Sequence, residues 1–175
     1  YYFYDFTFET SLKAYPQSAD WKIGVFFRCQ DIENYYAVRI GPSSLEVVSV
    51  VNNVQSVIFT TFNSGIWTKL KVEALGENFS VYLNDSNVTN LILSDFGSGA
   101  LGVLGMGQAV YAMDNARIVA GSYSLIADFD AFEAGEVPPF LLDVTPELDN
   151  FRAVLSIGDY AGSAGIKRLN LNLIW

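Results

Sequence analysis

The stretch Leu45–Phe62, LEVVSVVNNVQSVIFTTF, decides the fold class of this chain. Two runs rich in β-branched residues, Leu45–Val51 and Val54–Phe62, flank the dipeptide Asn52-Asn53. Asparagine tolerates the positive φ angle that a two-residue turn between antiparallel strands requires. The stretch therefore predicts a tight β-hairpin.

The same period of two extends outward from this hairpin in both directions. Tyr4, Phe6 and Phe8 alternate with polar residues, and a second hairpin is predicted at Gly76-Glu77-Asn78. We predict further strands near residues 21–28, 35–40, 68–74, 79–83, 91–93, 101–104, 110–119, 123–129, 151–157 and 166–173. Many short strands with frequent turn signals predict an all-β fold, an antiparallel two-sheet β-sandwich. Residues 133–150 are expected to form one long irregular connection.

Length and composition limit the choice of partners. The 175 residues suit one domain, and 51% of them are hydrophobic while 17% are charged. This apolar excess predicts a large core, an interface between copies, or both. A formal net charge of −9 argues against nucleic acid as a partner. The apolar runs fall far short of the ~20 residues that span a membrane.

The chemistry that the chain lacks argues against an enzyme. With no histidine it has neither a Ser-His-Asp triad nor a histidine-ligated metal, and we expect no required cofactor. Its one cysteine, Cys29, alternates in phase with Ile23 and Phe27, which predicts a small buried residue. Glycoside hydrolysis needs two facing carboxylates, whereas Glu46 and Glu73 stand isolated on their strands.

A set of segments in a fixed order resembles a known superfamily. They are Asp5–Glu9, Trp21–Arg28, Asp31–Arg39, Gly65–Glu73, Val81–Asn84, Gly99–Gly102 and Met113–Val119. This order resembles the laminin-G-like and 3-keto-disaccharide-hydrolase-like branch of the concanavalin A-like lectin/glucanase superfamily. The resemblance implies a jelly-roll β-sandwich used as an adhesive, carbohydrate-binding or stalk-forming module in secreted proteins.

The chain departs from that family at its ends. The acidic opening segment typical of such domains is missing, yet Asp128–Gly135 is similar to it and follows the last expected strand. We therefore predict that residues 1–120 form the main part of the sandwich. Residues 121–175 would then complete either this sandwich or that of a neighbouring copy. A permuted domain, one period of a tandem array and strand exchange between subunits all fit this order.

The two ends of the chain also suggest how copies would assemble. Consecutive aromatic residues at the beginning place rings on both faces of a strand, and a partner would cover the second set. The apolar phase of the last strand matches that of the first. The predicted assembly interface comprises Tyr2, Tyr4, Phe6, Phe8, Leu169, Leu171, Leu173 and Trp175.

One polar and aromatic group is a candidate ligand rim. It consists of Arg28, Asp31, Asn34, Tyr35, Tyr36 and Arg39. Aromatic faces stack on sugar C–H surfaces, while arginine and aspartate hydrogen-bond hydroxyl groups. The alternative is a polar hairpin turn at Asp31–Asn34, in which the side chains satisfy their own backbone.

A second group concerns a metal ion. In jelly-roll modules of the resembling family a calcium ion often ties the acidic opening segment to the final strand. By that resemblance Asp114, Asp130 and Glu133 are candidate ligands of a structural calcium, since Ca²⁺ prefers such oxygen ligands. The alternative is a set of solvated acids near a turn.

Taken together, the sequence favours a non-catalytic extracellular module that assembles with copies of itself by β-strand complementation, as a filament, surface array or tandem stalk. The alternative is a carbohydrate-binding module with glycan partners, and the third hypothesis is an oligosaccharide hydrolase. Candidate glycosylation sites at Asn78, Asn84 and Asn87 hint at an extracellular or cell-surface location.

Overall fold

The computed structural model describes residues 2–16, 20–63, 67–107, 109–127, 152–159 and 167–174. The strands are β1 (Phe6–Pro16), β2 (Lys22–Asp31), β3 (Asn34–Ile40), β4 (Ser44–Val51), β5 (Val54–Phe62), β6 (Trp67–Leu75), β7 (Asn78–Leu83), β8 (Ser86–Ile92), β9 (Ala100–Met106), β10 (Ala109–Ala120), β11 (Tyr123–Ala127), β12 (Arg152–Asp159) and β13 (Lys167–Ile174).

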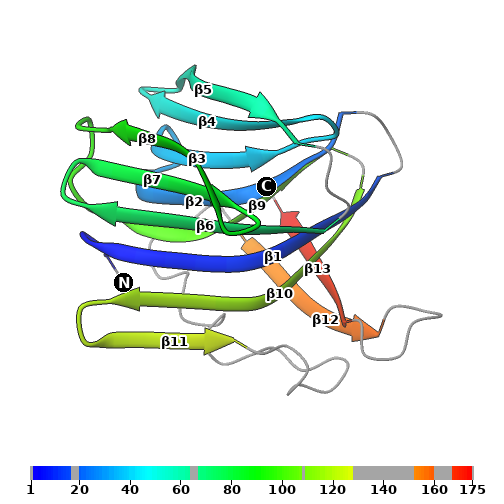
Figure 1. The fold of residues 1–175 in the computed structure, drawn as a ribbon. Coiled ribbons are helices and arrows are strands. Elements are labelled where there is room, and N and C mark those ends of the chain that lie inside the picture. Colours follow the sequence, from blue (N-terminus) through cyan, green and yellow to red (C-terminus); the bar gives the residue numbers. More distant parts are fainter. Residues whose placement is uncertain are drawn as a thin grey trace.

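These strands form two sheets that face each other (Figure 1). Within the described ranges, one sheet has eight strands in the order β12-β13-β10-β1-β6-β7-β8, with β11 beside β10. The other has five, in the order β5-β4-β3-β2-β9. Neighbouring strands in both sheets run antiparallel. The predicted all-β, antiparallel two-sheet β-sandwich is thereby confirmed.

The hairpin between β4 and β5 forms where its sequence indicates. Asn52 and Asn53 have φ angles of 51° and 62°, so both occupy the left-handed region that a tight two-residue turn needs. The second predicted hairpin turns at Gly76, with a φ angle of 57°. The strand expected at residues 91–93 is instead the longer β8, Ser86–Ile92, which follows a turn at Asn84 and Asp85.

The core lies between the two sheets. Aromatic rings fill its centre, and the Phe27 and Phe79 rings stack with centroids 5.1 Å apart. Full burial of an apolar side chain of this kind contributes roughly 1.5–3 kcal/mol. The remaining core members come from both sheets and include Leu12, Val25, Val38, Leu45, Val47, Leu70, Val72 and Val81.

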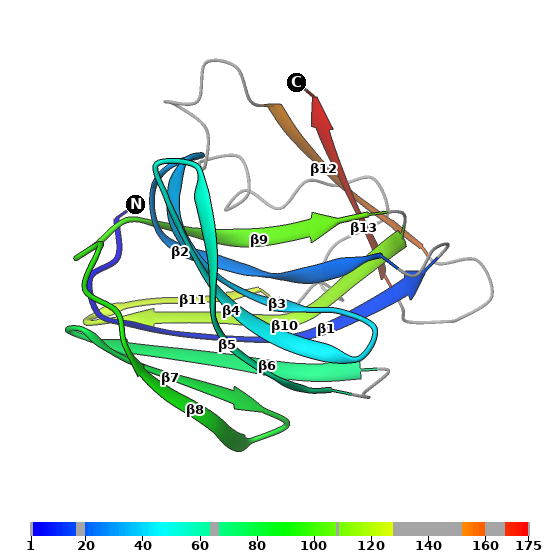
Figure 2. The ribbon, with the colours of Figure 1, turned by 90° about the horizontal axis from the view of Figure 1, so that it is seen from above.

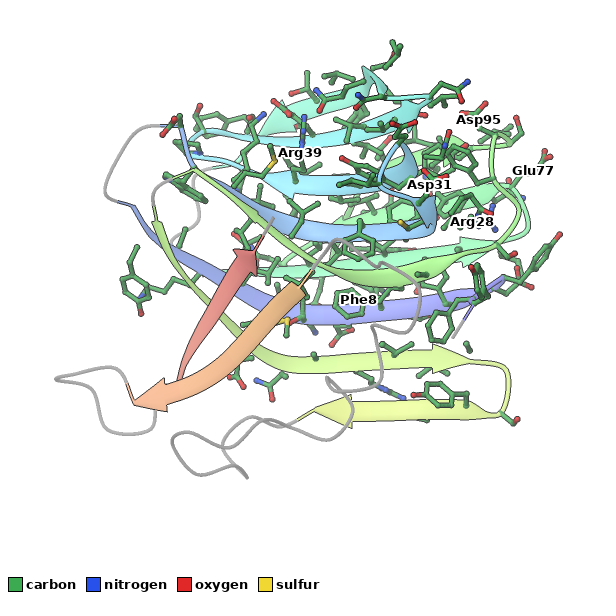
Figure 3. The ribbon with its side chains drawn as sticks, turned by 180° about the vertical axis from the view of Figure 1, so that it is seen from behind. Phe8, Arg28, Asp31, Arg39, Glu77 and Asp95 are labelled. Atoms are coloured by element: carbon green, nitrogen blue, oxygen red, sulfur yellow. The ribbon has the colours of Figure 1, made fainter. Side chains whose placement is uncertain are left out.

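Strand β1 lies inside its sheet, between β10 and β6, and not at an edge. Its alternate side chains Phe6 and Phe8 are buried in the core of this same chain, and Figure 3 shows Phe8 between the sheets. These two residues are therefore unavailable to a second copy, because they are packed between the two sheets of this chain. Tyr2 and Tyr4, which precede the strand, are exposed.

The later part of the chain continues the eight-stranded sheet. Strand β11 pairs with the second half of β10, while the β12–β13 hairpin joins β10 through the pair Tyr111↔Leu169. Figure 2 shows this hairpin running at a steep angle to β1 and β10. Whether residues 121–175 complete this sandwich or a neighbouring one stays a prediction.

The described residues contain no helix of the length and apolarity needed to span a membrane.

Candidate functional site

The five-stranded sheet carries the candidate site on the face that points away from the core, called here the outer face. Along β3, Tyr36 and Val38 belong to the core, so alternation places Tyr35, Ala37 and Arg39 on the outer face. In Figure 2 the β2–β3 and β4–β5 hairpins curl away from the other sheet.

Three neighbouring strands of this sheet bring a charged trio together: Lys22 of β2, Arg39 of β3 and Glu46 of β4. Arg39 and Glu46 are directly opposite each other in the β3–β4 ladder. Arg39 Nη2 donates to Glu46 Oε2 at 2.9 Å, and Lys22 Nζ donates to the same oxygen at 2.6 Å. Two cations thus share one carboxylate oxygen, which leaves the trio with a formal charge of +1.

Arg39 is unusually buried for a charged residue on an outward-pointing face. It is 5% exposed, and its Nη1 donates to Gln55 Oε1 of β5 at 2.7 Å. The long side chain therefore runs across β4, on which Val48 is fully buried. Its Nε is buried and has no hydrogen-bond partner among the described residues. An unpaired buried donor costs about 1–3 kcal/mol, so this nitrogen offsets part of the stability that the other hydrogen bonds of Arg39 contribute.

Glu46 remains ionised because of its two partners. Burial alone would raise the pKa of this carboxyl, but hydrogen bonds from Lys22 and Arg39 outweigh that effect and hold the pKa below its ordinary value. The outer face therefore carries an ionised carboxylate at neutral pH.

Aromatic side chains adjoin the trio on the same face. The Phe26 ring lies over Gly102 of β9, because a Cβ atom added to this glycine would overlap the ring. Only glycine leaves room for the ring to lie against the sheet at this position. Tyr35 is the diagonal neighbour of Phe26, since Phe26 pairs with Ala37 in the β2–β3 ladder. Phe26 and Tyr35 are both half-buried, so part of each remains open to solvent.

This combination suits a polyhydroxylated molecule. Fixed N–H donors and a carboxylate acceptor can hydrogen-bond neighbouring hydroxyl groups, while a flat ring contacts the apolar C–H surface of the same molecule. The trio contains a single carboxylate, so it does not supply the two facing carboxylates of a glycosidase.

The structure separates the six residues that the sequence groups as a ligand rim. Figure 3 shows Arg39 near one end of the five-stranded sheet and Arg28 with Asp31 at the other. Tyr35 and Arg39 lie on the outer face. Tyr36 lies in the core, and its hydroxyl donates to Asp95 Oδ2 at 3.1 Å and accepts from Asp95 N at 2.8 Å. Burial raises the pKa of Tyr36 to about 12.

Arg28 is a structural residue and not part of a surface rim, because it is 1% exposed. Its Nη1 donates to the carbonyl of Phe96 at 2.9 Å, and its Nη2 donates to the carbonyls of Tyr4, at 3.1 Å, and Gly76. The guanidinium carbon lies 4.5 Å from the centroid of the Phe79 ring. The residue thus joins three segments at one end of the sandwich.

A β-bulge explains this burial. The register of β2 shifts after Phe27, and Arg28 has a φ angle of 48°, so the strict alternation that would direct Arg28 outward ends here. The same irregularity leaves Cys29 half-buried instead of buried as predicted. Burial, and then the nearby Asp31, raise the pKa of this thiol to about 11.

Asp31 and Asn34 form the polar turn that the sequence offers as the alternative. Asp31 Oδ1 accepts from Glu33 N at 2.8 Å and from Asn34 Nδ2 at 2.9 Å. Asn34 Oδ1 also accepts from Asn52 N, which ties this turn to the β4–β5 turn. The side chains satisfy the local backbone, as such turns commonly do.

The other predicted site residues are only partly described. Asp114 accepts hydrogen bonds from the backbone and side chain of Asn115, whereas Asp130 and Glu133 lie outside the described residues. No cluster of potential metal ligands occurs among the described residues, and the calcium site stays a prediction.

The prediction for the last strand as an assembly interface also stays open. The structure does not describe the side chains of Leu169, Leu171 and Leu173, nor any part of Trp175. The three candidate glycosylation residues, Asn78, Asn84 and Asn87, are exposed.

The sequence analysis missed Lys22, Phe26, Glu46 and Gln55 as members of the site. For Glu46 the sequence does contain a signal. Arg39 and Glu46 each alternate with apolar residues on neighbouring strands, so both are expected to point away from the core. What the sequence lacks is the register that sets them opposite each other and brings Lys22 to the same oxygen.

Comparisons with known proteins establish the fold. No family model matches the chain, and no curated protein sequence matches it. Among solved structures, it is similar to the carbohydrate-binding module CBM66 from Bacillus subtilis. The TM-score is 0.60 and the identity 23%, over 67% of this chain and 76% of that chain.

The chain is also similar to the GH43 protein BlXynB from Bacillus licheniformis, with a TM-score of 0.55 and 12% identity, over 67% of this chain and 28% of that chain. These likenesses support a lectin-like jelly-roll sandwich. The particular superfamily and the rotated order of segments stay predictions.

Proposed function

We propose that this chain is a non-catalytic carbohydrate-binding module that holds a glycan on the outer face of its five-stranded sheet. The observation that carries the proposal is the trio of Lys22, Arg39 and Glu46 beside the half-buried Phe26 ring. Fixed donors, one acceptor and an aromatic surface together match the two sides of a sugar ring.

The comparison with solved structures supports this hypothesis over assembly as the main function. CBM66 is described as a carbohydrate-binding module, and it shares the sandwich over 67% of this chain. The likeness to BlXynB extends over only 28% of that protein and gives no reason to assign its activity. A hydrolase would also need a second carboxylate facing Glu46.

Assembly through the two ends of the chain is the weaker hypothesis. Two members of the predicted interface, Phe6 and Phe8, are enclosed in the core of this chain. An extracellular location fits a glycan-binding module, and it remains part of the proposal.

The experiment is a glycan-array screen of the purified chain, followed by calorimetric titration with the best-bound glycan. Phe26→Leu removes the ring but keeps an apolar side chain, and we expect it to weaken binding about tenfold or more, equivalent to about 1.4 kcal/mol. Tyr2→Leu is the matched control, because Tyr2 is an exposed aromatic residue outside the outer face.

A second pair of variants tests the charged trio. Glu46→Gln removes the acceptor that both cations share, and binding should fall well below that of the wild type. Glu73→Gln is its control, because Glu73 is paired with Lys71 and Tyr82 on the other sheet. Glycan binding that survives both Phe26→Leu and Glu46→Gln would overturn the assignment of the site, and no binding to any glycan would overturn the function.

A further inference from the structure

Strand β5 leaves one margin of the sandwich open. It pairs with β4 on one side, and on its other side no strand among the described residues pairs with it. Seven of its nine residues are exposed. Figure 1 shows β5 at the same margin as β8, which ends the other sheet. Such an edge carries a row of unpaired N–H and C=O groups that can accept another strand.

The apolar character of this margin is too high for a surface that stays in water. Val54 and Phe62 at the two ends of β5 are 66% and 74% exposed, and Ile92 of β8 is 75% exposed. Behind them, Phe59 and Leu91 pack against the core cluster but are only partly buried. The core is thus incompletely covered along this one side of the sandwich.

The absence of charge on this edge points to the identity of the partner. Neither β5 (VQSVIFTTF) nor β8 (SNVTNLI) contains a charged residue or a proline, although the chain carries a net charge of −9. Proteins commonly protect exposed edge strands with lysine or proline. A basic partner would be recognised through acidic side chains, which β5 lacks. A second copy brings the same negative charge, and it can approach closely only where like charges do not face each other.

We propose that β5 pairs antiparallel with β5 of a second copy of this chain, about a two-fold axis perpendicular to the sheet. The register of β5 against β4 shifts at Ile58, which separates two regular segments, 54–57 and 59–62. This shift reverses the alternation, because Val54 pairs with Val51 on the core side of the sheet while Phe62 pairs with Ser44 on the outer face. The two-fold axis therefore passes within one of the two segments and not at Ile58.

This pairing joins the two five-stranded sheets into one continuous sheet. A two-fold axis perpendicular to a sheet keeps the same face upward in both halves, so both outer faces would lie on one side of the dimer. Two binding faces in fixed relation increase the avidity for a surface that displays repeated glycans. The pairing itself rests on β5 and does not depend on the proposed glycan binding.

The test is the molar mass of the chain, measured by light scattering and by sedimentation over a range of concentrations. We expect a dimer that dissociates on dilution. Ile58→Lys places a charge between the two segments of β5, so two like charges come close in the pair and the variant should be a monomer. Ile32→Lys is the matched control, since it makes the same substitution at an exposed isoleucine in the β2–β3 turn and should remain dimeric.

Hydrogen exchange of the unmodified chain gives a measurement that does not depend on a variant. Amides of β5 should become more protected as the concentration rises, while those of the β2–β3 turn should not. A monomer at every concentration, open-ended oligomers, or a dimer that survives Ile58→Lys would each overturn the proposal. Glycan binding by monomeric Ile58→Lys would leave the proposed function standing, so the two proposals can fail separately.

Discussion

Replacing Arg28 with methionine tests whether a buried cation holds one end of the sandwich together. Methionine has a similar length and is apolar, so Arg28→Met removes the charge and hydrogen bonds while largely filling the space. The carbonyls of Tyr4, Gly76 and Phe96 then lose the donor that joins them. We expect a less stable protein that still folds.

The magnitude follows from two opposing contributions. A hydrogen bond to a charged group contributes roughly 1.5–3 kcal/mol, so three of them amount to about 6 kcal/mol. Burial of the guanidinium opposes this with a penalty of several kcal/mol, and its Nε has no hydrogen-bond partner within the described structure. The expected net loss in the free energy of unfolding is about 3 kcal/mol.

Urea unfolding followed by tryptophan fluorescence measures this loss. Arg28→Lys is the informative companion, because it keeps the charge but not the planar fork that reaches several carbonyls at once, and it should remain unstable relative to the wild type. A change below about 0.5 kcal/mol for Arg28→Met, the level of an ordinary surface substitution, would refute the reasoning.

Three further predictions concern single positions. The pKa of Glu46 lies below its ordinary value of 4.5 in the folded chain, so its ionisation stabilises the fold above that pH. This stabilisation should disappear as the pH falls through the lower pKa of the folded state. The free energy of unfolding should therefore fall less steeply at acid pH in Glu46→Gln than in the wild type. An equally steep fall in both proteins would contradict the prediction. Tyr36→Phe should cost about 1–2 kcal/mol, because Asp95 N loses its acceptor. In an ultraviolet titration the wild type should show one tyrosine that ionises near pH 12, and this signal should be absent from Tyr36→Phe. The same late signal in both proteins would show that Tyr36 is solvated. Gly24→Ala should prevent folding or lower the free energy of unfolding by more than about 3 kcal/mol, since the new methyl would overlap the backbone carbonyl of Val38. In Gly76→Ala the new methyl meets no neighbouring atom, so the loss should come only from the strained φ angle. Equal unfolding midpoints for these two variants would show that β2 and β3 can separate.

The sequence predicts the sandwich because its signals are local. The Asn52-Asn53 turn requires positive φ angles at two successive residues, and the alternating runs beside it have one apolar side each. Neither feature depends on the distant parts of the chain. The boundaries of β8 were harder to predict because Ser86–Ile92 contains two asparagines and a weak alternation.

The site could be predicted only in part, because it depends on register and on one bulge. Arg39 was identified as a candidate, but its partners come from β2, β4 and β5, and their alignment is set by the whole sheet. Arg28 was assigned to the same rim, on the side of β2 that strict alternation would direct outward. A positive φ angle at that residue turns it inward, and periodicity contains no signal for such a bulge.

The most direct test of the central claim is to map a bound glycan on the isotope-labelled protein by nuclear magnetic resonance. Backbone and side-chain signals of Phe26, Tyr35, Arg39 and Glu46 should shift on addition of the best-bound glycan from the array, and those of the eight-stranded sheet should stay in place. The ring signals of Phe26 should show the largest change, because this half-buried ring would contact the C–H surface of the sugar. Shifts confined to the Asp31–Asn34 turn or to the eight-stranded sheet would contradict the account.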